Sequence, residues 1–176
     1  NPVETYRGED VSGLARVFTG WDLDSTGLSK PYSPELMVRP MAQVPSRYET
    51  GAKQFLGANI ADGTEARAAL RTALDTLFAH PNVPPFVSRQ LIQRLVTSNP
   101  SGAYVRRVAA VFANNGQGVR GDLRAVVRAI LLDPAARSAT RLQDPSWGKL
   151  REPVHRFVHW ARAFGATSSA QAWDVG

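Results

Sequence analysis

Cysteine is absent from this chain of 176 residues. Its absence excludes disulfide scaffolds, thiolate metal sites and cysteine nucleophiles. No run of about 18 apolar residues occurs either, so the sequence offers no candidate for a membrane-spanning helix. The chain begins Asn1-Pro2-Val3, without an initiator Met and without the basic start, apolar middle and small-residue cleavage site of a signal peptide. We therefore expect a fragment or a processed product.

The motifs of several nucleotide-binding and hydrolytic sites are also missing. The sequence has no Gly-x-Ser-x-Gly, no P-loop and no dinucleotide-type glycine run. The run Asp22-Leu23-Asp24-Ser25-Thr26-Gly27 resembles part of a calcium loop but lacks the further spaced acids and the closing Glu. We therefore predict no cofactor.

The chain does contain an ordinary apolar fraction, 43%, and enough residues for one domain with its own core. We expect a single domain over residues 1–176. The formal net charge is +6, and the excess of basic residues, almost all Arg, lies in residues 71–176. An arginine-rich half is compatible with nucleic-acid binding, and the candidate side chains are Arg106, Arg107, Arg120, Arg124 and Arg128. Because they are spread over several helices, nucleic acid is not the partner that we expect.

Helical periodicity covers most of the chain after residue 64 and one stretch before it. Apolar residues at helical spacing, with stop signals at Gly, Asn-Pro and Asp-Pro, predict about six amphipathic helices, over residues 9–18, 64–79, 84–97, 101–113, 122–132 and 153–164. We expect Thr64, Ser101 and Asp122 to cap their helices, since each precedes an apolar-periodic run. The predicted fold class is all-α, a compact orthogonal bundle.

One long irregular excursion interrupts this pattern between residues 22 and 63. Four prolines within it exclude a long helix or a central strand. Short strands are expected around Leu36–Val38 and Lys53–Leu56, so the excursion can hold a short β-hairpin. The small, polar residues 166–176 are expected to form a frayed tail.

Six stretches in this order resemble a bacterial family catalogued as domain of unknown function 1800. They are EDVSGLARVFTGW (9–21), GAKQFLG (51–57), His80-Pro81 with FVSRQLIQRLV (86–96), Asn99-Pro100, GDLRAVVRAILLDP (121–134) and KLREPVHRFVHWARAF (149–164). The resemblance covers nearly the whole chain. Family members are longer, and the match implies their C-terminal portion, without the N-terminal helices.

The resemblance also implies a location. At one place, however, the chain departs from the family pattern. Members commonly look exported, so a periplasmic or secreted location is expected. They commonly carry a His-Asp-Gly-like run just before a Lys-Thr-Phe-Leu-Gly segment. This chain has Tyr48-Glu49-Thr50-Gly51 at the matching positions, so any chemical role of that His is lost or replaced here.

Three residues around the Pro-rich stretch 80–85 are candidates for chemistry. His80 precedes Pro81, Arg89 lies early in the helix that follows, and Asp75 lies on the helix before. As a catalytic set they would belong to an enzyme site completed by another part of the protein, as would Asp22 and Asp24. The structural alternative is a His that interacts with a helix C-terminus and an Arg89–Asp75 ion pair that holds the fold. We favour the structural alternative.

The pair His155 and His159 is the metal candidate, because residues four apart share a helix face. The run is His-Arg-Phe-Val-His, not His-Glu-x-x-His, and Arg156 and Arg162 would repel a cation. Zinc also needs a third ligand, so we predict two solvated histidines and no metal.

These observations lead to a non-enzymatic helical module of an exported bacterial protein as the first hypothesis. It would act through interaction surfaces, with the missing N-terminal part of the same protein or with a secreted protein partner, and the 22–63 excursion is a candidate surface. The enzyme and the nucleic-acid binder remain the two alternatives.

Overall fold

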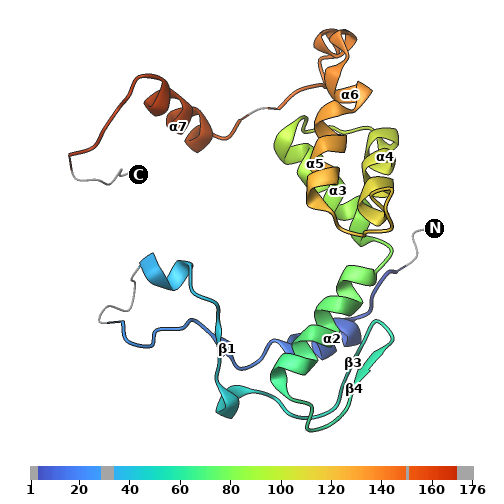
Figure 1. Cartoon of the computed structure of the whole chain (residues 1–176), viewed down its shortest axis with the longest axis vertical. Coiled ribbons are helices and arrows are strands. Elements are labelled where there is room, and N and C mark those ends of the chain that lie inside the picture. The colour runs from blue at the N-terminus through green and yellow to red at the C-terminus, as the bar shows by residue number, and fades with distance from the viewer. Residues whose placement is uncertain (1–3, 29–33, 150, 170–176) are drawn as a thin grey trace. The chain divides into compact units, whose positions relative to one another are not determined.

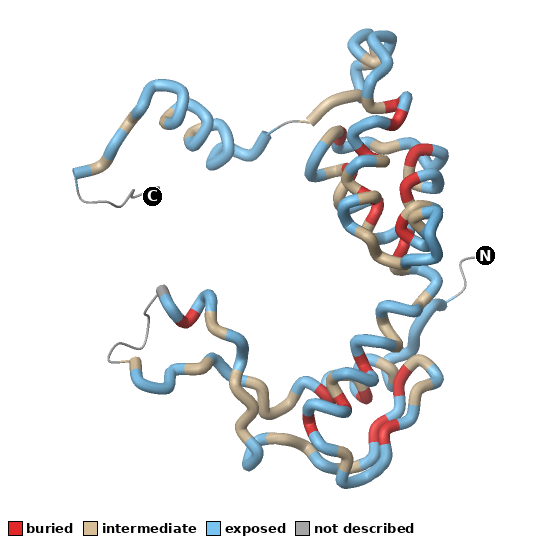
Figure 2. The backbone as a smooth tube through the Cα atoms, viewed as in Figure 1, coloured by how far each residue is buried: buried red, intermediate tan, exposed pale blue. Residues whose placement is uncertain are grey.

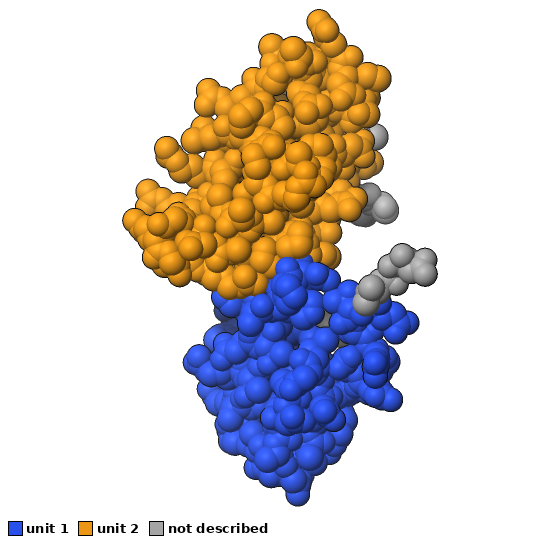
Figure 3. All heavy atoms as spheres, turned by 90° about the vertical axis from the view of Figure 1, so that its right-hand side faces the viewer, with its two compact units in different colours: residues 1–83 blue, residues 84–176 orange. Residues whose placement is uncertain are grey.

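A computed structural model describes residues 4–28, 34–149 and 151–169. Over these residues the chain is mostly helical, with two small antiparallel strand pairs (Figure 1). The predicted all-α class is therefore confirmed. The chain divides into two compact units, residues 1–83 and 84–176 (Figure 3). The single domain expected over residues 1–176 stays a prediction.

Unit 1 combines two helices with short strands. Its elements are α1 (Gly8–Val17), β1 (Trp21–Asp22), β2 (Ala42–Gln43), β3 (Lys53–Phe55), β4 (Ala58–Ile60) and α2 (Ala66–Ala79), with 3-10 turns at Pro34–Met37 and Pro45–Arg47. Strand β1 pairs with β2, and β3 pairs with β4 in register Lys53–Ile60. The hairpin expected within 22–63 is thus present. The strand expected at Leu36–Val38 is wrong, because Pro34 begins a 3-10 turn there.

The core of unit 1 lies between α1, the hairpin and α2. Its buried members are Val17, Phe55, Ile60, Ala69 and Ala73. Strand β3 alternates buried and exposed residues, so Lys53 and Phe55 point to the same inner side. This alternation carries the Lys53 side chain into the protein.

The hairpin turn is tied to the first turn of α1. Leu56 and Gly57 form the two-residue loop, and both have positive φ, 46° and 79°, which is the pattern of a type I′ turn. Such a φ is costly for Leu. The Leu56 N–H donates to Asp10 Oδ1 at 2.6 Å, and Oδ2 of the same carboxylate accepts from the Arg7 N–H at 2.7 Å. Asp10 therefore both caps α1 and fixes the hairpin loop beside it.

Helix α2 differs from the prediction at its start and in its buried face. Glu65, not Thr64, is the N-cap, and its carboxylate accepts from the Arg67 and Ala68 N–H groups. Helical periodicity predicts that the large apolar residues Leu74 and Phe78 face inward, but they are 51% and 46% exposed. The small residues Ala66, Ala69 and Ala73 are buried instead. Alanine lets the helix axis approach the hairpin closely, which is why the small residues and not the large ones form the contact.

Two helices of unit 2 begin at caps that the sequence predicts. Its elements are α3 (Val83–Leu95), α4 (Gly102–Ala113), α5 (Leu123–Leu132), α6 (Pro134–Arg137), a 3-10 turn (Ala139–Gln143) and α7 (Pro153–Ala163). The Ser101 hydroxyl accepts from the Tyr104 N–H and the Asp122 carboxylate from the Ala125 N–H, so both caps are confirmed. Tyr104, Val108, Phe112, Val126 and Ile130 are the buried residues that α4 and α5 contribute.

Helix α7 is the exception within unit 2. It begins at Pro153, as predicted, but none of its residues is buried (Figure 2). The sequence-based expectation that its apolar stripe faces inward is therefore wrong for the described residues. The frayed tail expected over 166–176 falls mostly on residues 170–176, which lie outside the described residues.

Candidate functional site

The predicted catalytic residues do not form a described cluster. Asp75 is exposed on α2, and His80 is the C-cap of that helix. The His80 Nδ1 accepts the Asn82 N–H at 3.2 Å, and the expected interaction of the ring with the helix C-terminus stays a prediction. Arg89 is exposed on α3, in the other unit. An exposed Arg needs no buried partner, and the Arg89–Asp75 pair stays a prediction.

The remaining sequence candidates are placed as follows. Asp22 bonds Arg47 at 2.6 Å, and Asp24 accepts the Thr26 N–H, which makes both turn-stabilising residues. His155 and His159 are exposed. Across the described ranges, no group of three or more His, Cys, Asp or Glu side chains could hold a metal ion.

Two of the five arginines considered for nucleic acid are engaged within the fold. Arg107 forms a two-bond ion pair with the nearly buried Asp133, at 2.8 and 2.7 Å. Arg120 lies over the Phe112 ring, 5.7 Å from its centroid. The nucleic-acid alternative stays an untested prediction.

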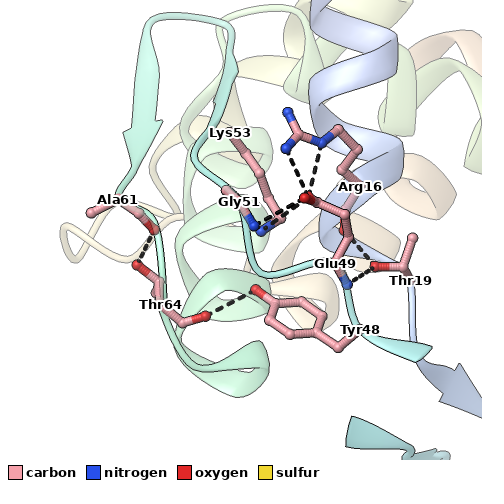
Figure 4. Close-up of polar contacts among 8 residues, drawn as sticks. All are labelled: Arg16, Thr19, Tyr48, Glu49, Gly51, Lys53, Ala61 and Thr64. Atoms are coloured by element: carbon pink, nitrogen blue, oxygen red, sulfur yellow. Dashed lines mark hydrogen bonds and ion pairs between the residues drawn. The ribbon is translucent and has the colours of Figure 1, made fainter. Parts of the chain in front are cut away.

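The polar cluster with the most contacts in unit 1 is centred on Glu49 (Figure 4). Glu49 Oε2 accepts from Arg16 Nε at 2.9 Å and from a terminal Arg16 nitrogen at 2.9 Å. Its Oε1 accepts the Gly51 N–H at 2.9 Å. The Lys53 Nζ lies 3.6 Å from Oε2. One carboxylate therefore holds an arginine, a lysine and a backbone N–H.

Lys53 is fully enclosed in this cluster. Its side chain has no exposed surface, its Nζ donates to the Gly51 carbonyl at 2.8 Å, and it lies 4.7 Å from the centre of the Tyr48 ring. A buried ammonium is costly unless it is paired and hydrogen-bonded. Glu49, the Gly51 carbonyl and the Tyr48 ring together offset that cost.

The backbone around the cluster is fixed from α1. The Glu49 N–H donates to Thr19 Oγ1 at 2.9 Å, and the Thr19 hydroxyl donates to the Arg16 carbonyl at 2.8 Å. The Tyr48 hydroxyl donates to the Thr64 carbonyl at 3.1 Å. The cluster therefore joins the end of α1 to the irregular segment before the hairpin.

The electrostatics of the cluster follow from these bonds. The hydrogen bond from Arg16 lowers the pKa of Glu49 to about 2, with further help from the Gly51 N–H and from Lys53. The same bond raises the pKa of Arg16. Glu49 is therefore a carboxylate at every physiological pH, and a poor proton acceptor. It is suited to holding cations in place and not to general acid–base catalysis.

A broad open groove of about 1100 Å³ runs beside the cluster, between α1 and the hairpin. The α1 side consists of Arg7, Gly8, Glu9, Ser12, Gly13 and Arg16, and the hairpin side of Ala52, Lys53, Gln54, Asn59, Ile60 and Ala61. Three of these residues are cationic and one is anionic. The groove therefore has a net positive lining with several neutral hydrogen-bonding groups.

The sequence-based reasoning missed this site. In the sequence, residues 48–51 stand out only as a departure from a family motif, and Arg16 does not stand out at all. The available signal was local: Glu49 and Lys53 flank Gly51, in a segment where a charged pair is unusual for a strand. Arg16 is 33 residues from Glu49, and no sequence pattern predicts a pairing at that distance.

Comparison with known proteins gives one result. The family described as "Protein of unknown function (DUF1800)" matches residues 3–175, essentially the whole chain. Comparison with curated proteins and with solved structures gave no match. The match agrees with the order of motifs along the chain, and the chain belongs to the DUF1800 family.

Proposed function

We propose that this chain is a non-enzymatic interaction module of an exported bacterial protein, and that the groove of unit 1 binds an acidic segment of a protein. The observation that carries the proposal is Arg16. Its guanidinium is held on one side by Glu49 and lines the groove, and its side chain is 43% exposed.

Arg16 retains donors for a ligand. Guanidinium has five N–H donors, and the bonds to Glu49 use two of them. The remaining donors suit a carboxylate, which arginine binds with two parallel hydrogen bonds. Because Glu49 already fixes the side chain, little rotamer entropy is lost on binding.

A second cation sets the spacing of the acidic groups. Arg7, the N-cap of α1, and Arg16, in its last turn, both line the groove and lie at opposite ends of the helix, roughly 13 Å apart along its axis. In an extended segment, residues four apart lie on the same side and are also roughly 13 Å apart. We therefore expect a segment with acidic side chains at positions i and i+4. It can belong to another part of the same protein or to a secreted partner.

Fluorescence anisotropy with labelled peptides tests this proposal. The probe is an extended heptapeptide of Thr and Val with Glu at positions 2 and 6, and its control carries Gln at both positions. The Glu peptide is expected to bind the full chain about tenfold more tightly. Arg16→Gln should remove the difference, while Arg71→Gln, at an exposed position on α2, should leave it. Equal binding of both peptides contradicts the proposal.

The exported location rests on the family resemblance alone. An antibody against the chain would detect the protein in the periplasmic or culture-medium fraction of the source bacterium if the location is right. Detection only in the cytoplasmic fraction would contradict it.

A further inference from the structure

Helix α7 combines an exposed apolar side with a basic polar side. Val154, Trp160 and Phe164 are 50%, 51% and 75% exposed. Phe157, Trp160 and Phe164 form an aromatic row. The Phe157 and Trp160 ring centroids lie 6.0 Å apart, and the Trp160 and Phe164 centroids lie 5.9 Å apart. A helix usually buries such a side against its own domain, yet α7 has no buried residue.

The opposite side of α7 is mostly basic and includes Val158. At 3.6 residues per turn, His155, His159 and Arg162 lie away from the aromatic row, together with Val158. Arg156 flanks the row, beside Trp160 and Phe164. Residues 153–163 contain no Asp or Glu. The preceding Glu152 is engaged with Arg94 at 3.3 Å. The charge of this helix is therefore uniformly positive.

The basic side also lines a hollow of about 500 Å³ with the end of α3. Its charged and His members are Arg94, Lys149, Arg151, His155, His159 and Arg162. This lining places the basic side of α7 toward the end of α3, and the Lys149 Nζ donates to the Arg94 carbonyl nearby. The aromatic row therefore points away from the body of unit 2, where an external surface can cover it.

We propose that α7 is an interfacial helix that lays its aromatic row on an anionic phospholipid bilayer. Aromatic and aliphatic residues on one side and arginines on the other are the signature of a helix that lies in the plane of a membrane surface. Eleven residues span roughly 16 Å, which is too short to cross a bilayer core of about 30 Å. Arg151 and Arg156, which line a hollow with Trp160 and Phe164, would bind the lipid phosphates beside the helix. Because cationic side chains attract anionic headgroups, an anionic bilayer should bind this helix more tightly than a neutral one.

Vesicle sedimentation of the full chain tests the proposal. Vesicles of phosphatidylglycerol and phosphatidylcholine in equal amounts are compared with vesicles of phosphatidylcholine alone. The chain is expected to sediment with the anionic vesicles and to partition at least about tenfold less onto the neutral ones. No binding to the anionic vesicles, or equal binding to both, overturns the proposal.

Matched variants locate the contact. Arg151→Gln with Arg156→Gln should weaken anionic-vesicle binding about 25-fold, since each cation near the surface contributes about fivefold. Arg124→Gln with Arg128→Gln changes the same charge on α5, at two exposed positions, and should change binding less than about twofold. Equal loss in the two double variants overturns the assignment to α7. Neither pair removes a buried group, and far-UV circular dichroism verifies the fold.

Insertion is tested separately from charge attraction. Brominated acyl chains should quench the Trp160 fluorescence of the vesicle-bound chain, and Trp160→Phe should remove that quenching while retaining binding. Quenching that persists in Trp160→Phe overturns the proposal. So does a stable dimer by sedimentation equilibrium that Phe164→Ser disrupts, because the apolar side would then be covered by a second copy of the chain.

Discussion

Gly13 of α1 and Gln54 of β3 approach each other so closely that a side-chain carbon on Gly13 would lie 1.9 Å from the Gln54 carbonyl oxygen. The contact is between two backbones, so neither side can rotate away. It sets the spacing between α1 and the hairpin, and hence the width of the groove that they line. Glycine is required at this position for space, not for an unusual φ.

Gly13→Ala should therefore destabilise unit 1 by at least about 1–3 kcal/mol, the usual cost of overpacking. Urea unfolding of the full chain, with hydrogen exchange of peptides from residues 53–60, measures the effect. Gly8→Ala is the matched control, since nothing lies within 4 Å of its added carbon. Equal stability of the two variants would contradict the close approach.

Glu49 should make unit 1 sensitive to acid. Its pKa is lowered from 4.5 to about 2 by the hydrogen bond from Arg16. A carboxylate with a depressed folded-state pKa stabilises the protein above its unfolded-state pKa, and that stabilisation is lost as the pH falls from about 4.5 through about 2. Glu49→Gln should lower the urea midpoint at pH 7, and its difference from the unmodified chain should shrink as the pH falls toward 2. Glu4→Gln, at an exposed position, should show no such difference at any pH.

Tyr104 should report the integrity of the α4–α5 core. Its buried hydroxyl donates to the Ile130 carbonyl at 2.6 Å, and Tyr104→Phe leaves that acceptor without its bond at a cost of about 1–3 kcal/mol. Tyr6→Phe, at a 63% exposed position, should cost almost nothing. Burial raises the pKa of Tyr104 to about 12 from 10.0. The unfolded chain ionises first, so stability should fall as the pH rises from about 10 toward 12, and Tyr104→Phe should lack that fall.

Removal of two buried hydroxyls of unit 2, one at a time, should change the stability of the protein in opposite directions. The Ser88 Oγ is buried without a hydrogen-bond partner, so Ser88→Ala should raise stability by about 1 kcal/mol. The Thr97 Oγ1 accepts the Gly148 N–H and donates to the Gly148 carbonyl, both at 3.2 Å. Thr97→Val should therefore lower stability by about 1–3 kcal/mol. Urea midpoints of the two variants decide the point, and a stabilised Thr97→Val would contradict these bonds.

Glu9 is the acidic residue among the groove-lining residues, and it opposes the binding of an acidic segment. Glu9→Gln should therefore strengthen binding of the Glu-containing peptide, by a few-fold for a surface charge, and leave the Gln-containing peptide unaffected. Anisotropy titrations at low and at high salt measure both. Weaker binding of the Glu peptide would show that Glu9 is part of the recognition and not an obstacle to it.

The sequence predicts the helix starts of this fold better than the buried sides of the helices. Ser101, Asp122 and Pro153 mark helix starts correctly, because caps and first-turn prolines act through local backbone geometry. The buried sides are less predictable. Periodicity predicts a stripe, but whether Leu74 or the adjacent Ala73 meets the hairpin depends on how closely two elements approach, which is not a local property.

The candidate site was predictable in part only. The departure at residues 48–51 directs attention to Glu49, but its role depends on Arg16 and on the inward turn of Lys53. Both are consequences of long-range packing between α1 and β3. Of the three predicted catalytic residues, His80 and Asp75 belong to one unit and Arg89 to the other, so this set stays a prediction.

The most direct test of the groove is a backbone amide chemical-shift titration of the full chain with the Glu-containing peptide. Binding as proposed shifts the amides of residues 7–16 and 52–61, with the largest changes beside Arg16, and the Gln-containing peptide leaves them in place. Shifts outside these two segments would contradict the proposed binding mode. Absence of shifts, with the unmodified chain giving the same titration as Arg16→Gln, would also contradict it.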